Sequence, residues 1–164
     1  MPDLLAVIEI PRGSRNKYEV DHETGAVSLD RTLFTSMVYP TEYGFIPETL
    51  GEDGDPLDAM VLLEFPTFPG CNIKVRPVAV FHMSDEAGRD TKILCVPKKD
   101  PRWAHIQNVD DVPKQIRSEI EHFFAHYKDL EPNKSVTIEG WGNVTSAEAE
   151  IEKARNSYAA NSHK

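Results

Sequence analysis

The sequence has few cysteines, no long hydrophobic run and no leading basic segment. No stretch approaches the roughly 18 apolar residues of a membrane-spanning helix, and the first residues do not resemble a secretory signal. We therefore expect a cytoplasmic protein with no membrane partner. The two cysteines, Cys71 and Cys95, lie in apolar, strand-like stretches without zinc-site spacing, which favours buried free thiols in a reducing compartment.

Positive charge is also scarce. The chain carries 18 basic and 27 acidic residues, which gives a formal net charge of −9 and a pI near 5.1. Such a surface repels the phosphate backbone, so we expect no nucleic-acid partner. An anionic small molecule is still compatible, because metal ions or locally gathered basic side chains can reverse the potential inside a cleft.

Length and chain punctuation indicate one mainly β domain over residues 1–164. The chain is long enough for a single hydrophobic core and contains no repeat or linker. Nine glycines and 12 prolines separate short apolar runs, as in barrels and sandwiches. The simplest architecture is a closed β core with helices packed outside it. The expected strands span residues 4–10, 17–20, 26–29, 44–46, 60–63, 73–83 and 92–96.

Two segments have helical patterns. The first is expected to begin at an N-cap formed by Asp110 or Asp111, with Pro113 in its first turn, and to end at about His126 or Tyr127. The second begins at the capping-box sequence 145–148 and runs to about residue 160. The first helix turns one apolar face toward the core. That face comprises Ile116, Ile120, Phe123, Phe124 and Tyr127.

Three closely spaced aspartates form the strongest chemical signal: Asp53, Asp55 and Asp58. Gly54 and Pro56 turn the backbone between them, so that their side chains can converge. Carboxylates are ligands for hard cations such as Mg²⁺, Mn²⁺ or Ca²⁺, and like charges held this close repel one another unless a cation lies among them. An apolar run follows at once, which indicates that the cluster lies at the mouth of a buried strand.

Further polar side chains complete a phosphoryl-transfer pattern. A second acidic pair, Asp85 and Asp90, brackets a turn between two expected strands, and Glu9 and Glu19 belong to the first two strands. Several carboxylates can hold more than one divalent cation, while Lys, Arg and Tyr contact phosphate oxygens. A two-metal phosphoryl-transfer site needs this combination. The accompanying residues are Lys17, Arg31, Tyr39, Tyr43, Lys92, Tyr127 and Lys128.

Five sequence blocks resemble those of soluble inorganic pyrophosphatases of the bacterial type, which hydrolyse diphosphate to two orthophosphates. Asp53-Gly-Asp-Pro-Leu-Asp-Ala59 matches the family signature D-x-D-P-x-D-x. The other blocks follow the family's order and spacing across residues 8–128. They are Ile8-Glu-Ile-Pro-Arg-Gly-Ser-Arg-Asn-Lys-Tyr-Glu19, Tyr39-Pro-Thr-Glu-Tyr-Gly-Phe45, Asp85 to Lys92 and His122-Phe-Phe-Ala-His-Tyr-Lys128.

The resemblance implies a five-stranded OB-like closed barrel with flanking helices, assembled into a homohexamer. It also implies several Mg²⁺ ions per active site, with Mn²⁺ or Zn²⁺ as substitutes and Ca²⁺ as an inhibitor. Asp53, Asp58 and Asp90 would bind the tighter metal, and Asp58 would be shared with a second one. Asp85 would join Asp90 on a metal that arrives with the substrate, and Glu19 would support a fourth.

By the same resemblance, Glu9 would lie behind the metal ligands. Asp55 would be the general base beside a water held between two metals, so that diphosphate hydrolysis would need no covalent intermediate. The side chains that would bind the two phosphoryl groups are Lys17, Arg31, Tyr43, Lys92, Tyr127 and Lys128, with Tyr39 lining the site.

Three other interpretations fit the sequence less well. An EF-hand calcium loop needs Gly at its sixth position, where Asp58 stands, and helices on both sides. A nucleotide-sugar transferase that uses Asp-Gly-Asp for Mn²⁺ would show βαβ alternation, which the pattern lacks. A non-catalytic OB-type nucleic-acid binder would carry a basic and aromatic stripe, which a net charge of −9 opposes.

The histidines are not expected to be catalytic. His122 and His126 are four residues apart on the first helix, but Phe123 stands where an HExxH zinc site has its glutamate. They fall away from the apolar face, so we expect solvent exposure or a pH-sensitive contact between subunits. His22 is expected in a turn.

Overall fold

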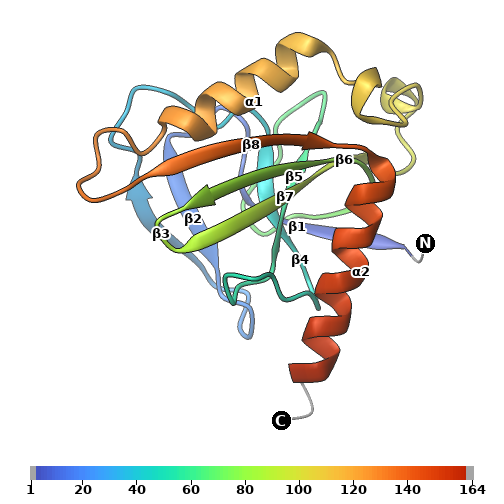
Figure 1. Cartoon of the computed structure of the whole chain (residues 1–164), viewed down its shortest axis with the longest axis horizontal. Coiled ribbons are helices and arrows are strands. Elements are labelled where there is room, and N and C mark those ends of the chain that lie inside the picture. Colours follow the sequence, from blue (N-terminus) through green and yellow to red (C-terminus); the bar gives the residue numbers. More distant parts are fainter. Residues whose placement is uncertain (1–2, 162–164) are drawn as a thin grey trace.

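The structure is a computed structural model that describes residues 3–161, in which strands surround a core flanked by two long helices (Figure 1). The strands are β1 (Leu4–Ile10), β2 (Asn16–Val20), β3 (Val27–Thr32), β4 (Glu42–Ile46), β5 (Leu57–Val61), β6 (Asn72–Asp85), β7 (Gly88–Pro97) and β8 (Val136–Gly142). The helices are α1 (Lys114–His126) and α2 (Val144–Asn161), with short 3₁₀ turns η1 (Pro101–Trp103) and η2 (Val109–Asp111).

Five strands pair in a ring. β1 pairs with β4, β4 with β5, β5 with β7 and β7 with β6, and the first part of β6 pairs back with β1. The β5–β7 pair is parallel, and the other pairs of the ring are antiparallel. β8 extends the sheet from the second part of β6. The ring and its two helices confirm the expected mainly β, five-stranded OB-like fold.

Strand β5 illustrates how the core is built. Leu57, Ala59 and Val61 belong to an apolar cluster that includes residues of α2, whereas Met60 belongs to a cluster that includes residues of α1. Both faces of the strand are covered, which explains why its sequence is a continuous apolar run. Asp58 shares the face of Met60, because side chains alternate along a strand, and it lies where that face meets a cavity.

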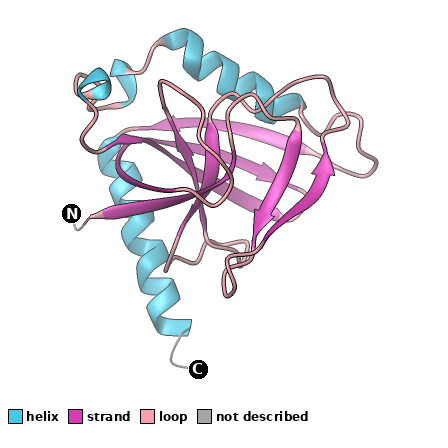
Figure 2. Cartoon of the chain, turned by 180° about the vertical axis from the view of Figure 1, so that it is seen from behind, coloured by secondary structure: helices cyan, strands magenta, loops and turns pink. Residues whose placement is uncertain are grey.

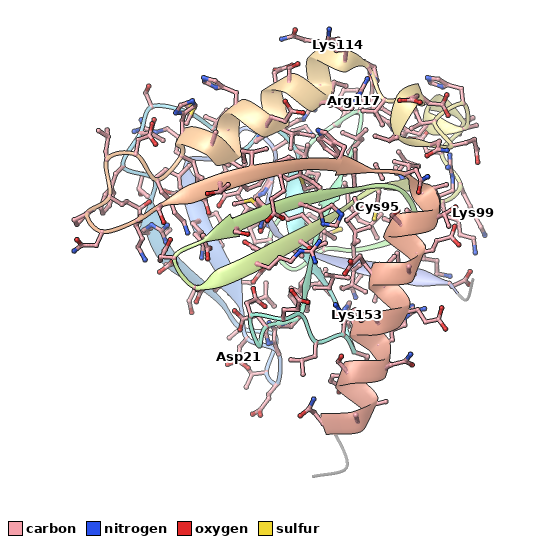
Figure 3. All side chains as sticks on the ribbon, viewed as in Figure 1. Asp21, Cys95, Lys99, Lys114, Arg117 and Lys153 are labelled. Atoms are coloured by element: carbon pink, nitrogen blue, oxygen red, sulfur yellow. The ribbon has the colours of Figure 1, made fainter. Side chains whose placement is uncertain are left out.

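The β2–β3 hairpin is a separate two-stranded sheet on the side of the barrel away from α2 (Figures 1 and 2). Its turn, where Figure 3 labels Asp21, confirms the expected turn at residues 21–25. Asp21 Oδ1 accepts hydrogen bonds from the backbone N–H groups of Glu23 and Thr24. Gly25 has φ of +76°, a conformation that glycine adopts without strain.

The start of α1 differs from the prediction. Asp110 and Asp111 belong to η2, whose N-cap is Asn108, and Pro113 directly precedes α1 without a side-chain cap. A proline disfavours helical backbone in the residue before it, so the α-helix cannot extend back to the aspartates. The predicted apolar face is confirmed. Ile120, Phe123, Phe124 and Tyr127 are buried, and Ile116 packs against them while partly exposed.

The C-terminal part also differs from the prediction in two places. The predicted capping box at residues 145–148 is wrong, because α2 begins at Val144 and Asn143 Oδ1 accepts a 2.9 Å hydrogen bond from the N–H of Ser146. Strand β8 was not predicted. It contains glycines and partly exposed positions along its length, so its sequence lacks the apolar run of the barrel strands.

Both cysteines are free, as expected. Cys95 is fully buried in the barrel, where Figure 3 labels it, but Cys71 is only partly buried, so the prediction of burial was wrong for that residue. Among the described residues, neither long helix has the apolar length needed to cross a bilayer.

Candidate active site

The acidic loop is a tight turn that leads into β5. Gly54 has φ of +88°, and the backbone N–H of Asp55 donates a 3.1 Å hydrogen bond to Asp53 Oδ1. Asp58 is the second residue of β5 and pairs in register with Lys92 of the parallel strand β7. The turn therefore holds the first two aspartates while the sheet holds the third, in agreement with the expected position at a strand mouth.

A cavity of about 570 Å³ opens in front of this loop. It lies between the β2–β3 hairpin, the acidic loop, the β6–β7 turn and the C-terminal end of α1. Every carboxylate that the sequence predicted for the site faces it, whereas three predicted residues lie outside its lining: Arg31, Tyr39 and Lys92. The predicted residues that line it are Glu9, Lys17, Glu19, Tyr43, Asp53, Asp55, Asp58, Asp85, Asp90, Tyr127 and Lys128.

Lys92 lies directly behind the acidic side of the cavity. Its side chain is only 1% exposed, and Nζ donates hydrogen bonds of 3.0 Å to Oδ2 of Asp58, 3.0 Å to Oδ2 of Asp90 and 2.6 Å to the hydroxyl of Tyr43. The ammonium also lies 5.0 Å from the ring centres of Tyr43 and Phe124. Burial lowers the pKa of Lys92, but the two carboxylates outweigh burial and raise it, so the group stays charged.

Burial and mutual repulsion make the charged forms of Asp53 and Asp58 less stable than in water. Burial raises the pKa of Asp58 against the effect of Lys92, and the Asp90 carboxylate raises it further. Burial also raises the pKa of Asp53, with Asp90 and Asp55 adding to the effect. A cation beside these groups would remove the penalty that burial and mutual repulsion impose on their charged forms.

The donor set fits a hard divalent cation. Carboxylate oxygens suit Mg²⁺ and Mn²⁺, and no thiol or imidazole is needed. Within residues 3–161, no three Asp, Glu, His or Cys side chains converge closely enough to hold one ion alone. Mg²⁺ commonly takes one or two protein carboxylates and completes its octahedron with water and substrate phosphate oxygens, so this spacing is compatible with it.

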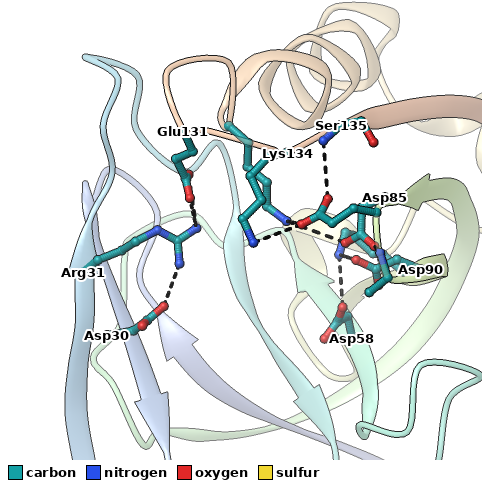
Figure 4. A network of polar contacts seen from close by, with 12 residues as sticks. Asp30, Arg31, Asp58, Asp85, Asp90, Glu131, Lys134 and Ser135 are labelled. Carbon is teal, nitrogen blue, oxygen red and sulfur yellow. Dashed lines mark hydrogen bonds and ion pairs between the residues drawn. The ribbon is translucent and has the colours of Figure 1, made fainter.

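The hairpin side of the cavity carries paired charges (Figure 4). Lys17 Nζ lies 3.0 Å from Asp30 Oδ2 and 3.2 Å from Glu19 Oε1. Arg31 Nη1 lies 2.7 Å from the same Asp30 oxygen, and Arg31 Nη2 lies 3.2 Å from both carboxylate oxygens of Glu131. The two basic side chains are therefore linked through Asp30, and Arg31 joins the hairpin to the segment that follows α1.

The opposite side carries a second set of ion pairs. Lys128 Nζ lies 3.6 Å from Asp85 Oδ2 and 3.7 Å from Glu86 Oε1. Lys134 Nζ also contacts Glu86, at 3.1 Å (Figure 4). These distances place Lys128 beside one predicted metal ligand and leave its ammonium facing the cavity.

Tyr39 supports the site from behind. Its side chain is buried, and its ring centre lies 5.4 Å from that of Tyr43 and 4.7 Å from that of Phe123. Burial raises the pKa of Tyr39 well above its usual value, so the phenol stays neutral. Tyr39 therefore does not line the cavity as predicted but packs behind Tyr43, which does.

Several lining residues were not predicted. Tyr18 alternates with Lys17 and Glu19 on β2, and His22 lies in the hairpin turn as expected but also reaches the cavity. The ring of His22 packs 4.7 Å from that of Phe45. The remaining lining residues that the sequence left unassigned include Asp21, Ala26, Ser28 and Ala87.

His122 and His126 lie elsewhere. Both side chains are exposed on α1, with ring centres 4.8 Å apart, and His126 Nδ1 lies 2.8 Å from Asp129 Oδ2. Their predicted exposure is confirmed, and a contact between subunits stays a prediction.

Comparison with known proteins identifies relatives over nearly the whole chain. Residues 6–159 match the family model described as inorganic pyrophosphatase. A protein of Leifsonia xyli named inorganic pyrophosphatase is 65% identical over 157 residues, which cover 96% of either chain. A protein of Streptomyces coelicolor with the same name is 62% identical over 147 residues, which cover 90% of either chain.

The fold has close counterparts among solved structures. An inorganic pyrophosphatase from Helicobacter pylori superposes with a TM-score of 0.93 at 45% identity, covering 96% of this chain and 94% of that one. An inorganic pyrophosphatase from Thermus thermophilus gives a TM-score of 0.93 at 46% identity, covering 96% and 92%.

Proposed function

The chain belongs to the inorganic pyrophosphatase family, whose reaction is the hydrolysis of pyrophosphate, and we propose that this reaction takes place in the carboxylate-lined cavity with divalent cations. The observation that carries the proposal is the set of charged and polar side chains that line the cavity. Carboxylates from four separate segments face it together with Lys17, Tyr43, Tyr127 and Lys128. Such a wall suits a polyanion accompanied by metal ions.

We assign the metal ligands as follows. Asp53, Asp58 and Asp90 bind the tighter ion, with Asp58 shared with a second, and Asp85 joins Asp90 on an ion that enters with the substrate. Because no three carboxylates of residues 3–161 converge on one point, some of these contacts run through water molecules bound to the ion. Glu19 supports a fourth. Mg²⁺ is the proposed activator, Mn²⁺ or Zn²⁺ substitutes, and Ca²⁺ inhibits, because Ca²⁺ takes more ligands at longer distances than the octahedral geometry of Mg²⁺. When bound, the cations lower the pKa of a water and offset phosphate charge.

Glu9 has a different proposed role. Its Oε2 accepts a 3.0 Å hydrogen bond from the backbone N–H of Val20. This bond attaches the end of β2 to β1, so Glu9 supports the wall that carries Glu19 rather than supplying a direct ligand.

The other side chains of the site are assigned to proton transfer and to substrate binding. Asp55 is the proposed general base, because it lies on the turn between the metal ligands and its carboxylate faces the cavity. Lys17, Tyr43, Tyr127 and Lys128 hold and orient phosphate oxygens by charge-assisted hydrogen bonds. Arg31 and Lys92, which lie outside the cavity lining, do the same when they contact the substrate. Water is the attacking group, so no bond to the protein forms.

The test is orthophosphate release from pyrophosphate. We expect rapid release in excess Mg²⁺, loss of release in EDTA, and recovery when Mg²⁺ is restored. A folded sample that releases no orthophosphate with Mg²⁺ or Mn²⁺ would contradict the proposal. Release that persists in EDTA would contradict the role of the cations.

We also propose a homohexamer. Large apolar side chains are exposed on the isolated chain, including Phe65 at 74%, Leu130 at 69% and Phe68 at 63%. Contact between copies would cover such groups. Sedimentation equilibrium should give six times the chain mass, and a monomer at micromolar concentration would contradict this assembly.

A further inference from the structure

The β2–β3 hairpin carries much of the proposed binding machinery but is not part of the barrel's hydrogen-bonded ring. Lys17, Glu19 and Arg31 all lie on it. Its strands pair with each other in a separate two-stranded sheet. The distance from these side chains to the acidic loop is therefore set by contacts outside the strand ladders.

Two carboxylates make such contacts, Glu9, which is partly buried, and Glu131, which is buried. At one end of the hairpin, Glu9 of β1 accepts the N–H of Val20 at 3.0 Å. At the other end, Arg31 Nη2 lies 3.2 Å from both oxygens of Glu131, which is a hundred residues further along the chain. Glu131 belongs to the segment just after Tyr127 and Lys128, so this ion pair links the two opposite walls of the cavity (Figure 4).

The guanidinium is held from two sides. Asp30 accepts from Nη1 at 2.7 Å, and Glu131 contacts Nη2. The remaining N–H, on Nε, is buried and has no acceptor among the described residues. The planar fork of arginine can turn only as a unit, so carboxylates on both Nη atoms fix where Nε–H points.

The burial of Glu131 makes this contact more than a surface pair. The Glu131 side chain is 6% exposed and that of Arg31 24% exposed. A carboxylate this deeply buried is costly unless a cation faces it, and removing Arg31 would leave the charge of Glu131 uncompensated. No other ion pair to Glu131 occurs in residues 3–161, so the carboxylate depends on Arg31.

We propose that Glu131 is a positioning residue. It fixes the orientation of the Arg31 guanidinium and the distance between the two sides of the cavity, one formed by the β2–β3 hairpin and the other by Tyr127 and Lys128. The proposal rests on the proposed function, in which Arg31 binds a phosphoryl group. It assigns Glu131 no contact with the substrate. It predicts that Glu131 affects the reaction only through Arg31.

The test is a double-mutant cycle on kcat and KM for pyrophosphate with Glu131→Gln, Arg31→Lys and the double variant. Glu131→Gln should lower kcat/KM roughly 10- to 100-fold, the range for loss of a hydrogen bond between charged groups. The double variant should be no worse than Arg31→Lys alone, because the two residues act as one unit. Glu131→Asp should recover part of the loss. The control is Glu119→Gln, an exposed carboxylate on α1, which should match the unsubstituted chain.

The outcomes separate the two proposals. If Glu131→Gln keeps the parent kcat/KM, or if its loss multiplies with that of Arg31→Lys, the positioning role is wrong while the proposed function stands. A lower melting temperature with unchanged kcat and KM would assign Glu131 to stability alone and would also overturn the positioning role. If the parent chain itself releases no orthophosphate, the proposed function fails first.

Discussion

The ammonium of Lys92 donates a 3.0 Å hydrogen bond to Asp58 from a position that is 99% shielded by the barrel, with a second bond of equal length to Asp90. Two carboxylates that the proposed metals would share are thus already partly compensated by one fixed internal cation. The metals and Lys92 stabilise the same charges, so removing Lys92 should be felt most strongly when no metal is bound.

Lys92→Met tests this relationship. The metal-free variant should lose about 3 kcal/mol of unfolding free energy, because two desolvated carboxylates lose their counter-charge. Saturating Mg²⁺ should raise its melting temperature more than that of the parent chain. Thermal unfolding with EDTA and with Mg²⁺ measures both quantities.

Lys134→Met is the matched control, because Lys134 is 40% exposed and, within residues 3–161, forms an ion pair with Glu86 alone. It should behave like the parent chain in both conditions. An Mg²⁺-induced rise that is equal in Lys92→Met and the parent would show that Lys92 does not compensate Asp58 and Asp90.

A substitution at Gly44 of β4 tests how closely the backbones of β4 and β1 approach each other. A Cβ atom added there would overlap the carbonyl oxygen of Val7 and crowd Ile8 on β1. Gly44→Ala should therefore destabilise the chain by about 3 kcal/mol or more, since neighbouring backbone cannot move aside cheaply. Urea denaturation measures the loss, and an unchanged midpoint would contradict the β1–β4 packing.

The buried carboxylate of Glu42, which does not line the cavity, leads to a prediction about how stability depends on pH. Its side chain is fully buried, and Oε2 has no partner among the described residues. Burial raises the pKa of Glu42 above its usual range, although backbone N–H groups of Arg12 and Thr67 oppose the shift. The folded chain therefore keeps this proton to higher pH than the unfolded chain, and stability is lost as pH rises through the raised pKa.

Glu42→Gln should remove that loss. The variant should be more stable than the parent at pH 7 to 8, and the difference should shrink as pH falls toward the ordinary range of glutamate. Melting temperatures from pH 4 to 8 measure the difference, with Glu119→Gln, at an exposed position, as the control. A difference that stays constant over this range would show that the charge of Glu42 is not what destabilises the fold.

The sequence predicts most of the barrel and the acidic loop, because the signals there are local. Gly54 and Pro56 indicate a turn regardless of tertiary context, and the apolar run after Asp58 indicates a strand covered on both faces. Helix starts were less predictable. Asp110 and Asp111 have the side chains of N-caps, but Pro113 prevents the α-helix from continuing through them.

The long-range ion pairs could not be predicted from residue patterns. Glu131 lies in a polar turn and meets Arg31 only because the chain folds back after α1. Lys92 follows Asp90 closely in the sequence, yet its burial and its bond to Asp58 arise from the parallel pairing of β5 with β7. Side chains that share a site through sheet register leave no local signature.

The most direct test of the account is turnover of pyrophosphate by Asp58→Asn at saturating Mg²⁺, with retained fold checked by circular dichroism. The control is Asp129→Asn, an exposed residue after α1. We predict at least a roughly 100-fold loss of kcat in Asp58→Asn, since one carboxylate shared between cations is removed, and no loss in the control. Near-normal turnover by a folded Asp58→Asn chain would contradict the assignment of the active site to this cavity.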